Sequence, residues 1–521
     1  MPRDKGFYIG LMFDRAAAAH GSAPVVLDVP LQVAPDGGTR WTVAGLAGLV
    51  RELAGRLRAA GVRRGERVAV YKTNNFDIAL LAAAAQRIGA VPALLSPTLD
   101  GVTATRLLER LERPWLLIDA DHLTTSGVDP SAARRVLLTA GVPGPGHEGP
   151  DVEALRDHAP VPLNGVKVVG PHEPAFISHT SGTTGLPKLV VQTPSALWQR
   201  LRLQKVVASR TWKRESVALC VSFVHARFYS ALNLGISYGN PLLVAVDADP
   251  AVIGPLFARH RPGVVETQPN TFVDWEVLAR ADGRPLANVR YYNATFDALH
   301  PRTVQTLLGA SVRRSPKFFQ LYGQSETGPV AGGWVSARGA ADGGRSVGWP
   351  LPGIVRMRIV DDRGRPVKAG TVGHIEVRSR TRAVTYLGED ERFRRQLRDG
   401  WWDMGDLGFK DALGRLHLLD REVDRIDAVD SNLEVEDTLM DRLPELREIV
   451  VVPSESGRPL PVVCTRDDAP LDPQRWRAAI AGLPAMEDVR QIPFDQVPRT
   501  ATWKVRRPEL VRMLAGGGVH G

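Results

Sequence analysis

One short stretch, SHTSGTTGLPK at residues 178–188, constrains this chain more than any other. It lies between two apolar runs of β-like composition, residues 175–177 and 189–191. Its glycines, Gly182 and Gly185, allow positive φ and close approach to a ligand, and successive N–H groups in such a turn bind anions. The hydroxyl-bearing residues are Thr180, Ser181, Thr183 and Thr184. With the positive charge of Lys188, this chemistry predicts a polyphosphate ligand.

The stretch is not a Walker A loop. That pattern needs glycine just before the lysine and Ser or Thr just after it. Pro187 and Leu189 occupy those two positions here. The local composition alone therefore leaves two alternatives, a phosphate loop of another kind or a Ser/Thr/Gly-rich surface hairpin.

Length and composition indicate a globular protein of at least two domains. The 521 residues exceed the size of one ordinary domain, and 44% hydrophobic with 24% charged residues is typical of water-soluble folds. There is no apolar run of about 18 residues and no signal-peptide core, so we expect a cytoplasmic protein without a membrane span. Two cysteines, Cys220 and Cys464, support neither a disulfide framework nor a multi-cysteine zinc site.

The charge pattern does not indicate a nucleic-acid-binding protein. The formal net charge is +9, and the pI is about 9.7. However, basic residues alternate with acidic ones, as in EDERFRR at residues 389–395, which is typical of a solvated face. The surplus positive charge is more simply used in a cleft that binds a polyphosphate.

The first hundred residues alternate between helical and strand patterns. Apolar residues recur at helical spacing over residues 41–61, a strand pattern follows at 67–71, and a second helix with an apolar run covers 77–95. Such alternation predicts a doubly wound parallel sheet. The string GPGHEG at residues 144–149 matches a dinucleotide fingerprint in letters only, because Pro145 lacks an N–H and no strand precedes it. We interpret it as a surface loop.

Later strings combine aromatic, acidic and basic residues in a defined order. In YGQSE at residues 322–326, Tyr322 offers an aromatic face for a base, and Glu326 offers a hard oxygen ligand for Mg²⁺. Asp406, in GWWDMGD, is an acceptor suited to hydroxyl groups. Taken one at a time, Glu326, Asp406 and the C-terminal Lys504 could equally be solvated charges.

Taken in order, the strings resemble those of the adenylate-forming superfamily, which includes acyl-CoA synthetases, firefly luciferase and peptide-synthetase adenylation domains. The matching segments are residues 178–188, 221–225, 289–297, 321–326, 400–406, 419–426 and 498–507. The chain departs from the family pattern at Leu189, Met404, Asp420, Val423 and Trp503.

The resemblance implies an α/β fold in which a large N-terminal domain with doubly wound sheets, residues 1–422, precedes a small mobile α+β C-terminal domain, residues 423–521. It implies ATP and Mg²⁺ as cofactors, with Glu326 as the metal ligand. Lys504 is the expected catalytic lysine, and His225 is expected to border the acyl and nucleophile channels. The expected ATP-binding residues are Thr180, Ser181, Gly182, Thr183, Thr184, Gly185, Lys188, Thr295, Phe296, Asp297, Tyr322, Gly323, Gln324, Ser325, Asp406 and Arg421.

The implied first step joins a carboxylic acid to AMP with release of pyrophosphate. For the second step, CoA ligases of the superfamily pass pantetheine along a Gly-rich loop, whereas residues 426–432 here contain no Gly-Gly pair and carry Val429 and Asp430. We therefore expect transfer of the acyl group to an amine, as in stand-alone amide bond synthetases of natural-product pathways. An acyl- or aryl-CoA ligase is the alternative, and an adenylate-binding pseudoenzyme is a minor one.

Overall fold

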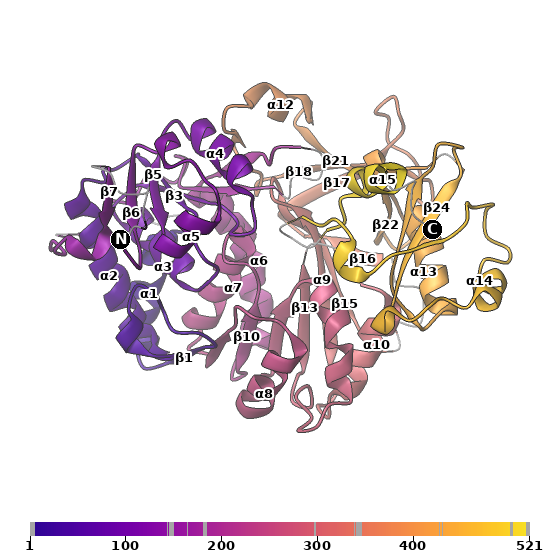
Figure 1. The fold of residues 1–521 in the computed structure, drawn as a ribbon, viewed down its shortest axis with the longest axis horizontal. Coiled ribbons are helices and arrows are strands. Elements are labelled where there is room, and N and C mark those ends of the chain that lie inside the picture. The colour runs from indigo at the N-terminus through magenta and orange to yellow at the C-terminus, as the bar shows by residue number, and fades with distance from the viewer. Residues whose placement is uncertain are drawn as a thin grey trace.

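The computed structural model describes residues 6–142, 144, 151–163, 165–180, 185–295, 299–337, 339, 346–426, 428–429, 431–500 and 504–516. Three sheets and the helices packed on them form an α/β fold, which confirms the predicted fold class (Figure 1). No helix within these ranges is long and apolar enough to cross a membrane. Most of the predicted surface loop at 144–149 lies outside the described residues.

The first sheet carries the phosphate-loop stretch between two of its strands. Its order is β19-β9-β8-β4-β3-β5-β6-β7, and all pairs from β8 to β7 are parallel, whereas β8, β9 and β19 pair antiparallel. The strands are β3 (Arg67–Val70), β4 (Val91–Leu94), β5 (Trp115–Ile118), β6 (Arg135–Leu138), β7 (Val152–Ala154), β8 (Phe176–His179), β9 (Leu189–Gln192) and β19 (Thr385–Tyr386).

The second sheet joins a parallel half to an antiparallel half. Its order is β17-β18-β21-β22-β16-β15-β14-β13-β12-β10-β11-β1-β2, with β20 on β21, and the pairs from β1 to β14 are parallel. The parallel strands are β1 (Pro24–Leu27), β10 (Val217–Cys220), β11 (Leu242–Val244), β12 (Val264–Thr267), β13 (Tyr291–Thr295) and β14 (Lys317–Gln324). The others are β2 (Arg40–Thr42), β15 (Gly328–Val335), β16 (Ser346–Pro350), β17 (Val355–Val360), β18 (Gly373–Ser379), β20 (Leu397–Arg398), β21 (Trp401–Lys410) and β22 (Leu416–Arg421).

Helices cover the parallel regions, and the predicted N-terminal helices are confirmed. Thr42 caps the first of them by accepting a hydrogen bond from Gly45 N, and Gly61 ends it with φ 111°, a conformation that glycine adopts without strain. Its apolar face lies in one cluster with residues of both sheets. The helices here are α1 (Ile9–His20), α2 (Val43–Ala60), α3 (Asp77–Arg87), α4 (Gly101–Arg110), α5 (Ala120–Thr125), α6 (Pro194–Thr211), α7 (Ala226–Ser237), α8 (Pro250–His260), α9 (Pro269–Asp274), α10 (Pro301–Ala310) and α12 (Asp390–Arg395).

The C-terminal elements form a separate small sheet with hydrophobic clusters of their own, whose members all follow residue 425. Figure 1 shows these elements in yellow beside β22 and β16. They are β23 (Leu446–Pro453), β24 (Pro459–Thr465), β25 (Arg490–Gln491), α13 (Asn432–Arg442), α14 (Pro473–Ala479) and α15 (Arg507–Gly516). The boundary between residues 422 and 423 stays a prediction.

Asp420 links the end of β22 to the start of α13. Its carboxylate accepts hydrogen bonds from Asn432 N at 3.0 Å and Leu433 N at 3.3 Å. A negative charge at a helix N-terminus is stabilising because the first N–H groups have no partner within the helix. Asp420 stands where the superfamily usually has glycine. In this chain its carboxylate therefore forms hydrogen bonds that connect the two sides of the predicted hinge.

We expect Asp420→Ala to weaken the attachment of α13 to the end of β22. Two hydrogen bonds to a charged acceptor are lost, and such bonds contribute about 1.5–3 kcal/mol each. Limited trypsinolysis after Arg425 should therefore become several-fold faster. The matched control is Glu422→Ala, which removes a neighbouring exposed carboxylate whose described ion pair is with His374, not α13. Equal cleavage rates in the two variants would contradict the assigned role.

Candidate functional site

The base of the phosphate-loop stretch is closed by two reciprocal hydrogen bonds. Thr180 N donates to Lys188 O at 3.0 Å, and Lys188 N donates to Thr180 Oγ1 at 3.0 Å. Strands β8 and β9 thereby continue as a hairpin whose loop opens from this pair, and Gly185 within it has φ 130°. Ser181, Gly182, Thr183 and Thr184 lie outside the described residues, so their predicted phosphate contacts stay predictions.

Lys188 contacts Glu326 and Tyr386 within the site. Lys188 Nζ lies 3.5 Å from Glu326 Oε1 and donates to the Tyr386 hydroxyl at 3.1 Å, and that hydroxyl donates to Glu326 Oε1 at 2.6 Å. The ammonium also lies 4.6 Å from the centre of the Tyr386 ring, a cation–π contact. Burial and the Glu326 carboxylate raise the pKa of Tyr386, so it remains a neutral donor at physiological pH.

Arg200 of α6 fixes the backbone on which Glu326 stands. Its Nη2 donates to the carbonyls of Ser325 at 3.0 Å and Glu326 at 3.2 Å, and its Nε donates to Thr381 O at 2.9 Å. Burial lowers the pKa of Arg200 to about 10, which leaves it charged at neutral pH. Gly328 has φ 65°, and a Cβ there would lie 2.6 Å from Arg200 Nε, so both positions are constrained.

Tyr322, Asp406 and Arg421 form a second polar group. The Tyr322 hydroxyl donates to Asp406 Oδ2, and Arg421 Nε lies 3.7 Å from Asp406 Oδ1. The partners come from adjacent strands, because Asp406 of β21 pairs in register with Arg421 of β22. Burial and Asp406 raise the pKa of Tyr322, which keeps its hydroxyl protonated. The arrangement places two acceptor oxygens beside a cation, which suits binding of vicinal hydroxyl groups.

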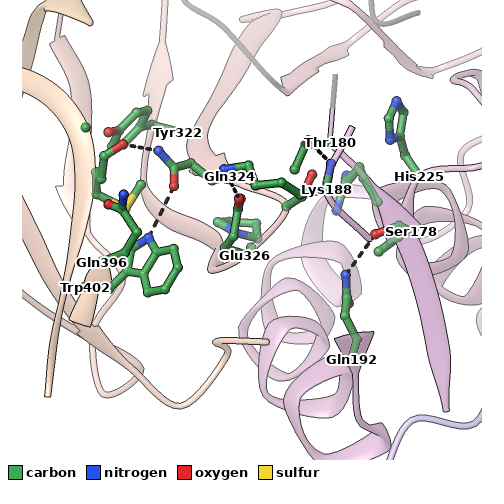
Figure 2. A pocket seen from close by; sticks show the side chains of 18 of the residues that line it. Ser178, Thr180, Lys188, Gln192, His225, Tyr322, Gln324, Glu326, Gln396 and Trp402 are labelled. Carbon is green, nitrogen blue, oxygen red and sulfur yellow. Dashed lines mark hydrogen bonds and ion pairs between the residues drawn. The ribbon is translucent and has the colours of Figure 1, made fainter. Parts of the chain in front are cut away.

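Gln324 joins this group to the wall formed by Trp402 and Met404. Its Nε2 donates to Met404 O, and Trp402 Nε1 donates to its Oε1 at 3.4 Å. Figure 2 shows Gln324, Trp402 and Tyr322 on one side of Glu326, with Thr180, Lys188 and His225 on the other. Met404 stands where the superfamily usually has threonine. Its thioether side chain is buried, and its backbone carbonyl accepts the hydrogen bond from Gln324.

His225 is buried at the start of α7 and lies on the same cavity as Lys504. Burial, with the nearby charges of His179 and Lys504, lowers the pKa of His225 to about 3. The imidazole is therefore neutral throughout the physiological range and does not compete with Lys504 for an anion. Among the described residues, no group of three His, Cys, Asp or Glu side chains is placed to hold a metal ion.

Lys504 reaches the cavity from a hairpin in the C-terminal part of the chain. Thr500 N donates to Lys504 O at 2.8 Å, Lys504 N donates to Thr500 Oγ1 at 3.2 Å, and Arg499 pairs with Val505 in an isolated bridge. These contacts set the backbone of Lys504 even though residues 501–503 lie outside the described residues. The conformation is thus one in which the C-terminal lysine faces the N-terminal motifs.

Most of the predicted site residues that the structure describes line one cavity of about 430 Å³. The predicted residues on its wall are Thr180, Lys188, His225, Tyr322, Gly323, Gln324, Ser325, Glu326, Arg421 and Lys504. Asp406 is attached to it through Tyr322, and Gly185 is not on the wall. Thr295 ends β13, and its side chain, with Phe296 and Asp297, lies outside what the structure describes.

Sequence reasoning missed several residues of this site, among them Arg200, Arg227 and Tyr386. Tyr386 and Arg200 are far in the chain from the motif residues that they contact, and Arg227 contacts Glu266 and Gln204, which belong to no motif. Tyr386 reaches Lys188 because β19 pairs with β9, and a single sequence contains no local signal for that pairing. Arg200 and Arg227 lie on helices whose cavity-facing sides show no pattern distinct from other polar helix positions.

Residues 13–387 match the family model described as AMP-binding enzyme. The chain belongs to this family. It is an ATP-dependent adenylating enzyme, and the resemblance to the adenylate-forming superfamily is confirmed.

Among curated proteins, this AMP-binding enzyme is 54% identical over 534 aligned positions to "3-amino-2-hydroxy-4-methoxybenzoate diazotase" of Streptomyces cremeus, covering 99% of this chain and 97% of the relative. Among solved structures, it is similar to anthranilate CoA ligase AuaEII in complex with anthranoyl-AMP, with TM-score 0.82, 18% identity and 98% of both chains covered. It is also similar to amide bond synthetase McbA from Marinactinospora thermotolerans, with TM-score 0.75, 24% identity, and 97% and 99% of the chains covered. At these identities the two structures show the fold alone.

Tyr386→Phe tests whether the Lys188–Tyr386–Glu326 contact prepares the nucleotide site. The change removes a hydroxyl that bonds to two charged groups, a loss of about 1.5–3 kcal/mol. We expect the Kd for ATP with Mg²⁺, measured by calorimetry, to rise roughly 10-fold. Tyr238→Phe is the matched control, because its hydroxyl bonds to Lys205 O outside the cavity. An equal Kd in both variants would contradict the role of Tyr386.

Proposed function

We propose that this enzyme is an ATP-dependent diazotase that converts the amino group of an aromatic acid into a diazonium group. The supporting observation is the 54% identity, over nearly the whole chain, to a protein named as a diazotase of an aminohydroxybenzoate. At that identity and coverage, a shared reaction class is better supported than the activities of the more distant CoA ligase and amide bond synthetase.

The chemistry of diazotisation fits an adenylating enzyme. A diazonium group needs a second nitrogen at the oxidation level of nitrite, and nitrite is an oxyanion that can attack a phosphate as a carboxylate does. A nitrite oxygen would form a bond to the α-phosphorus of ATP as pyrophosphate leaves, giving a mixed anhydride of nitrite and AMP. The amine nitrogen would then attack the nitrosyl nitrogen, and AMP would leave with the bridging oxygen.

The remaining steps balance without an external oxidant. The attacking amine loses one proton, giving an N-nitrosamine, which tautomerises to a diazohydroxide. Protonation of that hydroxyl and loss of water give the diazonium ion. The enzyme must hold the anions, stabilise charge at the α-phosphate and exclude bulk water, which would hydrolyse the mixed anhydride.

Roles for the residues follow from their positions and from the superfamily resemblance. Thr183, Thr184 and Lys188 would hold the β- and γ-phosphates, and Asp406 with Arg421 would hold the ribose. Lys504 would stabilise the charge that develops where the oxyanion meets the α-phosphate. His225, uncharged and buried, would border the route of the amine. The remaining nucleotide contacts are proposed for Thr180, Ser181, Gly182, Gly185, Thr295, Phe296, Asp297, Tyr322, Gly323, Gln324 and Ser325.

Glu326 fits the magnesium ion that such a reaction requires. Its carboxylate lines the cavity, and the contacts to Lys188 and Tyr386 engage only Oε1 in the described structure. Mg²⁺ is usually held by one or two carboxylates together with substrate phosphates and water, so a single protein carboxylate suffices. When bound, the ion would neutralise phosphate charge.

Amide formation remains the second candidate, because it too ends with an amine that attacks an adenylate. The two reactions differ in which oxyanion is adenylated, nitrite or the carboxylate of the acid. Val429 stands in the segment where CoA ligases have a Gly-rich loop, and its side chain lies in the hydrophobic cluster of the C-terminal part and is 7% exposed. Asp430 lies outside the described residues.

We also propose that residues 423–521 move as a lid on residues 1–422.

The test is product analysis at pH 8, where uncatalysed diazotisation by nitrite is negligible. Purified protein receives ATP, Mg²⁺, nitrite and 3-amino-2-hydroxy-4-methoxybenzoate, and the products are trapped by azo coupling and identified by mass spectrometry. We expect an azo product that requires both ATP and nitrite. Lys504→Ala should lower its rate by roughly 10²–10³-fold, whereas the exposed Lys213→Ala should not change it.

Parallel reactions receive simple amines or CoA in place of nitrite. Pyrophosphate release that needs the aromatic acid but not nitrite, with an amide as the product, would replace the diazotase proposal with amide synthesis. A CoA thioester as the dominant product would replace both with a CoA ligase.

A further inference from the structure

A buried arginine on the cavity wall is not used by any step above. Arg227 is the second residue of α7, two residues after His225, and its side chain is 10% exposed. None of its cavity neighbours on α6 and α7 is acidic: they are Gln204, Ala226, Ser230 and the cation Arg200. The N-terminus of α7 adds the positive end of a helix dipole to the same place. Glu266 balances the charge of Arg227, so it is the helix end and the remaining N–H donors of Arg227 that suit an anion here.

Two partners hold the Arg227 guanidinium in a fixed orientation. Nε and Nη2 donate to the two carboxylate oxygens of Glu266 at 2.5 Å each, and Nη1 donates to Gln204 Oε1. Glu266 stands on β12 and is completely buried. A guanidinium has five N–H groups. Within the described part of the chain, these bonds engage three of them, so each terminal nitrogen keeps one N–H for a ligand.

The buried pair is costly as a purely structural device. Desolvation of two charges often exceeds their attraction, and apolar residues of similar volume would usually serve a core equally well. At the wall of a cavity the pair has another use, because Glu266 orients a cation that keeps N–H donors not engaged by the described residues. Planar donors of this kind match the two oxygens of a carboxylate.

We propose that Arg227 receives the carboxylate of the aromatic amine, so that the ring is held by its acid group and the amino group is presented to the adenylate. This assignment rests on the proposed diazotase function. It follows that the carboxylate is a recognition group and is not itself adenylated. Arg227 is then a specificity-determining residue, and the substrate class is aromatic amines that carry an acidic group.

The experiment measures binding without turnover. Calorimetry gives the Kd of 3-aminobenzoate and of the uncharged 3-aminobenzamide, each with Mg²⁺ and a non-hydrolysable ATP analogue present. Wild-type protein should bind the benzoate about 30-fold more tightly, as expected for hydrogen bonds between charged partners. Arg227→Gln/Glu266→Gln should reduce that preference to roughly 2-fold or less, without weakening 3-aminobenzamide binding. The paired change avoids leaving Glu266 as an unpaired buried charge.

Two further variants separate recognition from structure. Glu266→Gln alone keeps the cation and should keep the preference for the benzoate. Lys504→Ala should keep it as well, because the carboxylate is placed at Arg227 and not at the α-phosphate. A preference that persists in the double variant, or is lost only in Lys504→Ala, would overturn the proposal. Equal weakening of both ligands in the double variant would also overturn it, since Arg227 would then only support the wall.

Failure of this inference can be distinguished from failure of the diazotase function. If wild-type protein diazotises 3-aminobenzamide as efficiently as 3-aminobenzoate, the Arg227 proposal is overturned and the function stands. If no diazonium product forms but the benzoate preference depends on Arg227, the anion site stands and the function is overturned.

Discussion

The contact among Lys188, Tyr386 and Glu326 is the interaction on which the site depends. Lys188 directly precedes β9, and Tyr386 lies on β19 of the same sheet, whereas Glu326 follows β14 of the other large sheet. The contact therefore joins the two sheets across the cavity between them. A lysine, a neutral phenol and a carboxylate within hydrogen-bonding range also keep positive and negative groups together where a metal-bound polyphosphate must enter. Arg200 stabilises the same arrangement, because it donates hydrogen bonds to the carbonyls of Ser325 and Glu326.

Much of this site could be predicted from local patterns. The strands on either side of residues 178–188 and the helix and strand order from 41 to 95 agree with expectation, and Glu326, Arg421 and Lys504 line one cavity. Such features depend on short-range periodicity and on motif order. Tyr386, Arg200 and Arg227 were missed because their roles arise from pairing of distant strands and from helix orientation. In the sequence, Asp420 is only a departure from a family pattern. The structure shows that its carboxylate accepts a hydrogen bond from the N-terminus of α13.

The acceptor of the activated group is harder to predict from sequence than adenylation, for a physical reason. Adenylation is specified by a set of charged and hydroxyl groups that bind ATP, and these groups can be recognised in order along the chain. The second substrate is selected by the shape and charge of a pocket, where a single side chain can change the preferred ligand, as we propose for Arg227. A buried cation in that pocket is consistent with an acid that remains free, whereas an acid that is adenylated would need its partner at Lys504.

The central claim is that nitrite, and not the aromatic carboxylate, is joined to AMP. Oxygen-isotope transfer tests it directly. Wild-type protein is supplied with ATP, Mg²⁺, the aminobenzoate and nitrite labelled with ¹⁸O, and the AMP product is examined by mass spectrometry. Attack by a nitrite oxygen predicts one ¹⁸O atom in each AMP molecule formed. Unlabelled AMP from labelled nitrite, with label appearing in AMP when the aromatic carboxylate carries ¹⁸O, would contradict the account.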